Sequence, residues 1–431
     1  MKKKINRRIM PPIKEITHIS LDQPLTYVLD NGIKIYLINT GQHEACKIEF
    51  HFATGRTDEH KRLVAKSTLR LIKDGTRQYN SSQLAEKIDF YGAALNLNAQ
   101  LDASSIVLTA LNKHLENLIP ILAEIIWDPI FPQSELEVYK KNNQERLKLE
   151  LIKNDVIAYR KFTELIFGEN HPYGYNSFPE TYDQIFREDI LKHHLERFGT
   201  SNCTIFISGK IADSEIKLIN KYFGQNKKIV KLQSLIYNGE INFSPQKLNI
   251  ITEDTVQTSI KLGIKCFNRS HSDYYGMFVL NTIIGGYFGS RLMLNIREDK
   301  GYTYNIYSSL DTMKYDGYFY ISTDTSHDLV EKTKAEIYKE IKKLQEKPID
   351  AEEQSMVKNY LLGNFLTMID GPYNTIDVVK TFISEDLEIS HFNQLIEYIK
   401  TFNVADIQAL ANKYLNKSQL WEITVGGKNK K

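Results

Sequence analysis

The feature of this 431-residue chain that most limits its fold is an order of predicted elements that occurs twice. The order is a strand, a helix, a short helix, two strands, and a longer helix that ends at a turn containing proline. It begins at the alternating strand 48–52 in the first half and at 260–266 in the second. Each half closes on a strand followed by glycine, at 204–209 and at 422–427. Such a repeat predicts an α+β fold of two homologous lobes, each an antiparallel sheet flanked by helices.

The boundary between the lobes is placed where the apolar periodicity is lost. Residues 224–246 carry turn-forming residues, among them Asn238 and Gly239. We therefore expect an N-terminal lobe at 1–223, a linker at 224–246 and a C-terminal lobe at 247–431.

Composition argues against several classes of partner. Lysine and arginine number 55 and aspartate and glutamate 53, so no bulk positive field draws the chain to nucleic acid or to an anionic membrane. Cys46, Cys203 and Cys266 form no C-x-x-C pair, which fits a reducing compartment. Pro11 and Pro12 interrupt the basic N-terminus before any long apolar run, and no later run reaches membrane-spanning length. We expect a cytoplasmic protein with no nucleic acid and no membrane among its partners.

The stretch 59–76 has the surroundings of a metal site without its ligands. Its pattern resembles the zinc helix of the pitrilysin and insulysin family, the inverzincins, in which H-x-x-E-H precedes a Gly-Thr pair. Here the first, fourth and fifth places of that motif are Lys66, Leu69 and Arg70. A zinc site needs imidazoles or carboxylates, and catalysis needs a carboxylate base beside the metal-bound water. These three side chains serve neither purpose.

The resemblance extends over nearly the whole chain. Three further motifs carry it: Asn31-Gly32, the sequence H-P-Y-G at 171–174, and G-G-Y-F-G-S-R-L with I-R-E-x-x-G-Y-x-Y at 285–304. They are similar to sequences of the family's short two-lobed branch, which includes mitochondrial processing peptidase. The resemblance implies two lobes per chain, with two chains or two fused halves closing around an unfolded peptide. It also implies zinc on one wall and an arginine and a tyrosine on the opposite wall, which here match Arg297 and Tyr304.

A second loss accompanies the first. The family's third zinc ligand is a glutamate that falls by position at 146–148, where no acid stands, although Glu145 and Glu150 flank the place. No two histidines of the sequence lie three to five residues apart, so no substitute helical zinc motif exists. We therefore expect no metal in this chain and zinc in a partner subunit.

Two other stretches have a plain and a functional interpretation. The pair His193-His194 fits a solvated helix surface, with Leu195 turned inward. Gly285, Gly286 and Gly289 stand at a helix start, where a phosphate can bind. The lysine and the serine or threonine of a P-loop are missing there, so these glycines are predicted to pack closely or to line the peptide cleft.

Two pairs of residues keep alternatives open. Lys66 and Arg70 form either a solvated helix face or a pair that places positive charge in the cleft, where acids of this chain or of its partner meet it. Arg297 either complements a helix dipole or holds substrate, and Tyr304 is either one more aromatic residue on a strand or a donor to an oxyanion.

The sequence therefore favours a non-catalytic, substrate-binding subunit of a heterodimeric zinc metallopeptidase. Its expected partners are a homologous H-x-x-E-H subunit and an unfolded peptide, with a homodimer possible when that subunit is absent. The alternative is a structural or peptide-binding protein derived from the same family, with no role in proteolysis. Retention of Arg297 and Tyr304 favours the first interpretation, and the missing ligands disfavour a self-sufficient peptidase.

Overall fold

The structure is a computed structural model that describes residues 16–230, 244–253 and 255–427. Part of the predicted linker, 231–243 with Asn238 and Gly239, lies outside the described residues. The elements of the first half are β1 (Leu25–Val28), β2 (Lys34–Ile38), β3 (Ala45–Phe52), α1 (Val64–Leu71), α2 (Ser81–Phe90), β4 (Ala94–Ala99), β5 (Ser104–Leu111), α3 (Leu115–Trp127), α4 (Gln133–Glu150), α5 (Asn154–Phe167), α6 (Arg187–Arg197), β6 (Cys203–Gly209) and α7 (Asp213–Phe223).

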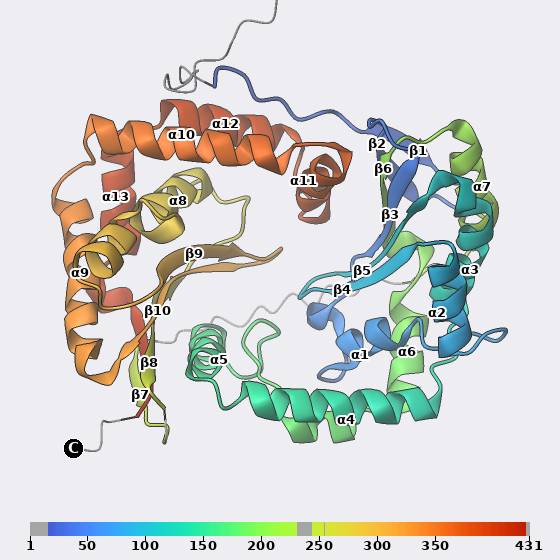
Figure 1. Cartoon of the computed structure of the whole chain (residues 1–431), viewed down its shortest axis with the longest axis horizontal. Helices are drawn as coiled ribbons and strands as arrows, with labels where there is room; N and C mark the ends of the chain where they lie inside the picture. Colours follow the sequence, from blue (N-terminus) through green and yellow to red (C-terminus); the bar gives the residue numbers. More distant parts are fainter. Residues whose placement is uncertain (1–15, 231–243, 254, 428–431) are drawn as a thin grey trace, which may run out of the picture.

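The second half follows the same plan (Figure 1). Its elements are β7 (Lys247–Ile250), β8 (Gln257–Lys265), α8 (Tyr274–Asn281), β9 (Ile306–Thr312), β10 (Gly317–Ser326), α9 (Val330–Glu346), α10 (Ala351–Met368), α11 (Pro372–Ser384), α12 (Ser390–Thr401), α13 (Val404–Tyr414) and β11 (Trp421–Val425). Within the described residues, no helix has both the length and the apolar character needed to cross a bilayer.

The two sheets have the same strand order. The first runs β1-β2-β6-β3-β5-β4 and the second β7-β11-β8-β10-β9, so they match strand for strand once β1 is set aside. The pairs β2–β6 and β7–β11 are parallel, and the other neighbours are antiparallel. The structure confirms the predicted two-lobed α+β fold, with the correction that each sheet contains one parallel pair.

Each half lends one helix to the sheet of the other half. The first-half helix α5 packs on β8 and β11, where Phe162 and Phe167 join Tyr318 and Ile423 in one apolar cluster. The second-half helix α11 packs on β2 and β6, whose Phe206 belongs to the core of the second half. In Figure 1, α11 lies beside β2, β3 and β6, and α5 lies near β8. The exchange joins the two halves through their sheets.

A glycine makes room for α5. A Cβ atom built on Gly263 in β8 would stand 2.4 Å from the ring of Phe162. This approach is closer than real side chains allow, so only glycine lets the aromatic ring lie directly on the strand.

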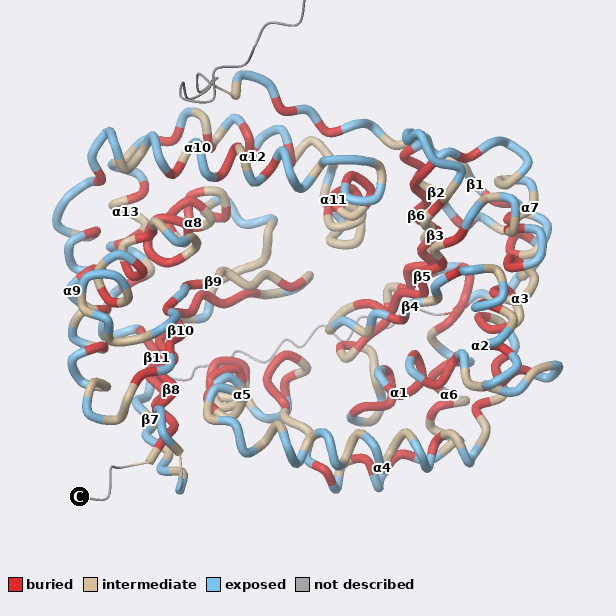
Figure 2. Tube along the Cα trace, viewed as in Figure 1, coloured by how far each residue is buried: buried red, intermediate tan, exposed pale blue. Residues whose placement is uncertain are grey.

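The exchange also changes the environment of β3. Lys47, Glu49 and His51 alternate with apolar residues along β3, a pattern typical of a strand with one solvated face. Instead, Glu49 is 1% exposed and His51 is 5% exposed, because α11 covers that face. Figure 2 shows β3 buried along most of its length. Lys380 of α11 compensates the Glu49 charge at 2.8 Å, and Asp377 of α11 accepts from Lys47 at 2.7 Å.

Candidate functional site

The residues at the zinc-motif positions lie on α1. Helix α1 packs against α6, β4 and β5, which buries Leu69 completely and leaves Lys66 and Arg70 exposed one turn apart. The place of the glutamate base is thus part of the hydrophobic core. The places of the two histidines carry cations on an accessible face.

The N-terminus of α1 is closed by Glu59. Its carboxylate accepts hydrogen bonds from the backbone N–H groups of Leu63 (3.2 Å) and Ala65 (3.1 Å), and from the Tyr175 hydroxyl. Burial raises the pKa of the Glu59 carboxyl to about 7. Arg56 donates to the backbone oxygen of Tyr175 and lies over that ring, 3.3 Å from its centre. The helix N-terminus therefore already has its anionic partner.

Helix α4 brings a third cation to α1. Ser67 of α1 donates to the Tyr139 hydroxyl of α4 at 3.3 Å, and Arg146 lies two turns further along the same side of α4. The surroundings partly desolvate the Lys66 ammonium, and the charges of Arg70 and Arg146 repel it, so the pKa of Lys66 falls below its ordinary value. The position predicted for the third zinc ligand thus carries positive charge.

Zinc does not fit the residues of this site. Glu145 and Glu150, which flank the predicted ligand position, pair with Lys148 at 2.8 Å and Lys153 at 3.1 Å. Across the part of the chain that the structure describes, no three histidine, cysteine, aspartate or glutamate side chains are grouped as metal ligands. Cations around Lys66 would repel a divalent metal ion rather than bind it.

Arg297 and Tyr304 lie on either side of the Gly301 turn. Arg297 belongs to the π-helical segment Met293–Asp299, and the positive φ of Gly301 (63°) ends that segment. The interpretation that placed Tyr304 on a strand does not hold, because β9 begins only at Ile306. Tyr304 therefore lies in an irregular segment, and its side chain is 86% exposed.

The two side chains differ in their contacts. The Arg297 guanidinium pairs with Glu298 at 3.3 Å and lies 5.0 Å from the centre of the Phe288 ring. Among the described residues, none forms a hydrogen bond with the Tyr304 hydroxyl, and the two side chains make no direct contact. Their roles stay a prediction. The arginine is held in place, and the tyrosine is presented to solvent.

The three glycines of the predicted cleft loop lie close to other atoms. A Cβ on Gly285 would stand 2.5 Å from the Ser308 backbone nitrogen of β9, and one on Gly289 would stand 2.7 Å from the Tyr287 ring. At Gly286 the corresponding approach is 3.1 Å, to the backbone oxygen of Asn281. Close packing, one of the two interpretations of these glycines, thus describes Gly285 best.

The expectation that His193 and His194 lie on a solvated surface is wrong. They are 1% and 6% exposed, whereas Leu195, expected to point inward, is 66% exposed. Burial lowers the pKa of His193 to about 3 and that of His194 to about 4. Nε2 of His194 donates to the backbone oxygen of Ile126 at 2.8 Å. The signal was the helical period, since both histidines stand three or four residues after the buried Ile190.

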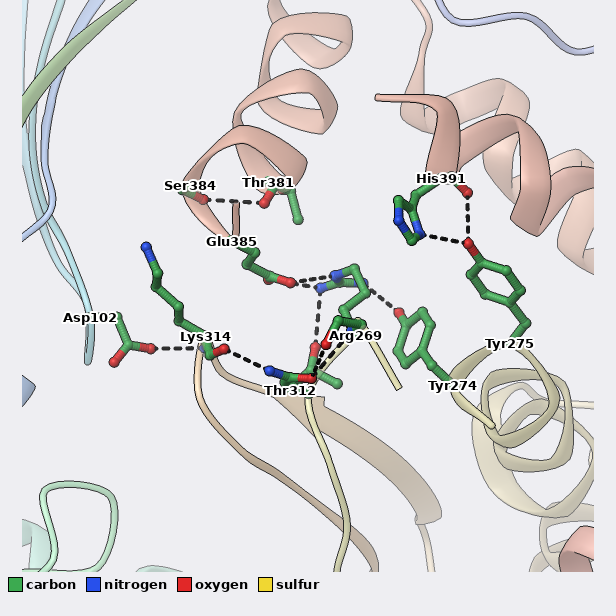
Figure 3. Close-up of polar contacts among 12 residues, drawn as sticks. Asp102, Arg269, Tyr274, Tyr275, Thr312, Lys314, Thr381, Ser384, Glu385 and His391 are labelled. Atoms are coloured by element: carbon green, nitrogen blue, oxygen red, sulfur yellow. Dashed lines mark hydrogen bonds and ion pairs between the residues drawn. The ribbon is translucent and has the colours of Figure 1, made fainter. Parts of the chain in front are cut away.

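Sequence reasoning did not find a cavity between the halves. It has a volume of about 520 Å³ and is lined by residues of both. On its first-half side, Asp102 accepts from the Tyr173 hydroxyl of the H-P-Y-G motif (2.6 Å) and from the Lys314 backbone N–H (3.1 Å). On its second-half side, Arg269 donates to Glu385 at 2.9 Å (Figure 3). The hydrogen bond from the Lys314 backbone N–H to Asp102 links the two halves at the cavity, whereas the Arg269–Glu385 ion pair lies within the second half.

Comparison with known proteins shows which family has this architecture. A family model described as "Insulinase (Peptidase family M16)" matches residues 34–158, and one described as "Peptidase M16 inactive domain" matches residues 184–361. The chain belongs to the M16 peptidase family.

Proteins similar to this chain include a Bacillus subtilis protein named "Uncharacterized zinc protease YmxG", 24% identical over 386 residues, or 89% of this chain and 92% of the relative. A Helicobacter pylori protein named "Non-peptidase homolog YmxG" is 21% identical over 382 residues, or 87% of each chain. The crystal structure of a peptidase M16 inactive domain from Pseudomonas fluorescens has a TM-score of 0.86 at 20% identity, and the match covers 94% of this chain and 98% of that one. This likeness shows the fold.

Within the M16 family, this chain is a homologue that lacks the residues of the zinc site. At the positions that the sequence predicts for two ligands and the base, the chain has Lys66, Leu69 and Arg70, and Arg146 stands near the predicted position of the third ligand. The feature that the chain shares with the solved M16 structure is its fold.

Proposed function

We propose that this chain is the non-catalytic, substrate-binding subunit of a heterodimeric zinc metallopeptidase, and that it supplies Arg297 and Tyr304 to a partner that carries H-x-x-E-H. The observation that carries the proposal is the state of Tyr304. Tyrosine buries its ring when its role is structural, but this ring is 86% exposed, and no described residue hydrogen-bonds to its hydroxyl. A side chain in that state is available to a ligand from another molecule.

The chemistry of the pair suits a peptide substrate. A guanidinium binds a substrate carbonyl or carboxylate by charge-assisted hydrogen bonds, and Phe288 and Glu298 restrict where the Arg297 guanidinium lies. A phenol donates to the oxyanion that forms on the scissile carbonyl. In this proposal Arg297 orients the peptide and Tyr304 stabilises negative charge on it, while the partner contributes the zinc and the base.

Cytoplasmic location is part of the same proposal. The three cysteines are unpaired, and Cys46 and Cys203 are buried, which agrees with a reducing compartment.

The test is reconstitution with a homologous H-x-x-E-H subunit. We expect peptidase activity from the mixture and none from this chain alone. Tyr304→Phe lowers turnover by about a hundredfold while the complex still assembles, because one oxyanion donor is lost. Arg297→Ala also weakens peptide binding. Tyr373→Phe is the matched control, since it removes a hydroxyl that forms no hydrogen bond with any described residue and whose side chain is partly exposed.

Size-exclusion chromatography separates lost assembly from lost catalysis. Full activity of both variants in an intact complex contradicts the assigned roles. A mixture that never becomes active, from a chain that still binds peptide, replaces the proposal with the alternative of peptide binding without proteolysis.

A further inference from the structure

Lys66, Arg70 and Arg146 form a group of positive charges that the proposed function leaves unused. Lys66 and Arg70 lie one turn apart on the exposed face of α1. Arg146 comes from the side of α4 that contacts α1, and its charge acts on Lys66 together with the charge of Arg70. We call these three residues the cationic cluster.

Acids of the described part of the chain form no ion pairs with the cationic cluster. Within the described ranges, no carboxylate lies within ion-pair distance of any of its three members. Two other cations of α4 are different: Lys140 pairs with Glu137 at 3.5 Å and Lys148 pairs with Glu145 at 2.8 Å. These lysines behave as expected for a solvated helix face, because each has a carboxylate partner nearby. The cationic cluster differs because its three members have no such partner among the described residues.

The local backbone argues against a compact phosphate site. Phosphates bind at helix N-termini through free backbone N–H groups. At the N-terminus of α1, the Glu59 carboxylate already accepts from the N–H groups of Leu63 and Ala65. The cationic cluster consists instead of side-chain charges on two helices, with two guanidinium forks that match carboxylates bidentately.

We propose that the cationic cluster binds the carboxylates of an acidic peptide segment at the position where zinc-binding M16 relatives hold their metal. This inference rests on the proposed function in one respect, that the ligand of the cleft is a peptide. It adds which peptides the chain prefers, namely those with glutamate or aspartate near α1. The M16 site thus keeps positive charge at this position, supplied by side chains fixed on two helices.

A bound carboxylate relieves an unfavourable arrangement. Partial desolvation and repulsion by Arg70 and Arg146 lower the pKa of Lys66 in the free chain, so a negative group among the three stabilises the protonated lysine. The attraction is electrostatic and partly solvent-exposed, so it weakens as ionic strength rises.

The experiment measures peptide binding to the full chain by fluorescence anisotropy. The probes are a glutamate-rich peptide and its glutamine-substituted counterpart. We expect the glutamate peptide to bind more tightly at low salt, and Lys66→Gln, Arg70→Gln and Arg146→Gln each to weaken it by about three- to tenfold. The glutamine peptide is unaffected by these substitutions.

Lys148→Gln is the matched control, because it removes one positive charge from the same helix two residues from Arg146, at a lysine with its own partner. We expect no more than a small change from it. Thermal melts check that the four variants keep the stability of the parent chain.

Three outcomes overturn the inference. The two peptides bind equally, or neither binds, or Lys148→Gln weakens binding as much as Arg146→Gln does. A further experiment competes the bound glutamate peptide with inorganic phosphate and, separately, with sodium chloride. If phosphate displaces the peptide at a much lower ionic strength than sodium chloride does, the cationic cluster is a phosphate site instead. Failure of these tests leaves the Tyr304 assay untouched, and inactivity in that assay leaves the charge preference untouched, so the two ideas fail separately.

Discussion

The two exchanged helices perform the same task with different chemistry. Helix α5 covers the second sheet with aromatic side chains, and Phe162 lies 5.9 Å from the ring centre of Tyr318 and 5.8 Å from that of Tyr320. Helix α11 covers the first sheet with apolar residues and also with charges, which form ion pairs to Lys47 and Glu49. In both halves a helix from the other half covers the sheet. The side chains that make this helix–sheet contact differ: they are aromatic at α5, and apolar and ionic at α11.

This difference predicts different responses to mutation. An aromatic contact stabilises through apolar area removed from water, so it depends on volume and hardly on pH. An ionic contact around a buried carboxylate depends on each partner, since removal of one leaves an uncompensated charge. The following predictions test this contrast.

The largest effect is expected from Phe162→Ala in α5. The ring is fully buried, and its removal leaves a cavity over Gly263. We expect the free energy of unfolding to fall by about 3–5 kcal/mol, measured by urea titration. Phe288→Ala, at an exposed phenylalanine, serves as the control. A loss below about 1 kcal/mol for Phe162→Ala would mean that α5 does not hold the second sheet by its apolar face.

Lys380→Met in α11 should cost somewhat less, about 3 kcal/mol, because it leaves the buried Glu49 carboxylate without its cation. The same titration measures the loss. The double variant Glu49→Gln, Lys380→Met should recover part of it, since no charge then stays buried. If the two single changes are additive, Glu49 and Lys380 do not act as a pair.

Acid should loosen the α11 contact at His51. This imidazole is buried against α11 and donates or accepts a hydrogen bond with Ser105 at 3.1 Å, and burial lowers its pKa to about 4. A lowered pKa means that the stability is fully present above the ordinary pKa of 6.5 and is lost as pH falls toward 4. At pH 5 the loss is roughly 2 kcal/mol.

Hydrogen exchange, corrected for the intrinsic effect of pH, measures this loss as reduced protection of residues 372–384. His51→Phe should make that protection less sensitive to acid. Equal protection at pH 7 and pH 5 in the parent chain would show that the His51 site accepts a proton without cost.

The smallest effect is expected from Asp377→Asn. Burial raises the pKa of this carboxyl, but Lys380 and Lys47 more than offset burial and hold the pKa below its ordinary value. The side chain is 45% exposed, so solvent screens the pair. We expect a loss of about 0.5–1 kcal/mol in the same titration. A loss as large as that of Lys380→Met would place the centre of the ionic contact at Asp377.

Much of the fold could be predicted because the spacing of apolar residues along the sequence indicates which segments form helices and which form strands. The repeated order of elements follows from local patterns, and the two sheets have the same strand order. The exchange of α5 and α11 could not be predicted, because an apolar stripe on a helix does not say which sheet it covers. Lys47 and Asp377 form an ion pair although they are 330 residues apart in the sequence. The residues around Lys47 give no indication that Asp377 is its partner.

The candidate site also has features that the sequence predicts and features that only the structure shows. The loss of zinc ligands at Lys66, Leu69 and Arg70 is visible in the residues themselves. The electrostatic influence of Arg146 on Lys66 depends on how α4 packs against α1, and only the structure shows this packing. Tyr304 was expected on a strand, but β9 starts two residues later, so the exposed ring is a feature that local propensity did not show.

The exchange of helices also affects when the first sheet can be completed during translation. The last strand of the first sheet is translated by Gly209, whereas α11 begins at Pro372. At roughly 5–20 residues per second, the ribosome needs on the order of ten seconds or more to make the intervening chain. During that interval the face of the first sheet that carries Phe206 has no helix to cover it. The nascent first half therefore exposes this apolar face to water until α11 has been translated.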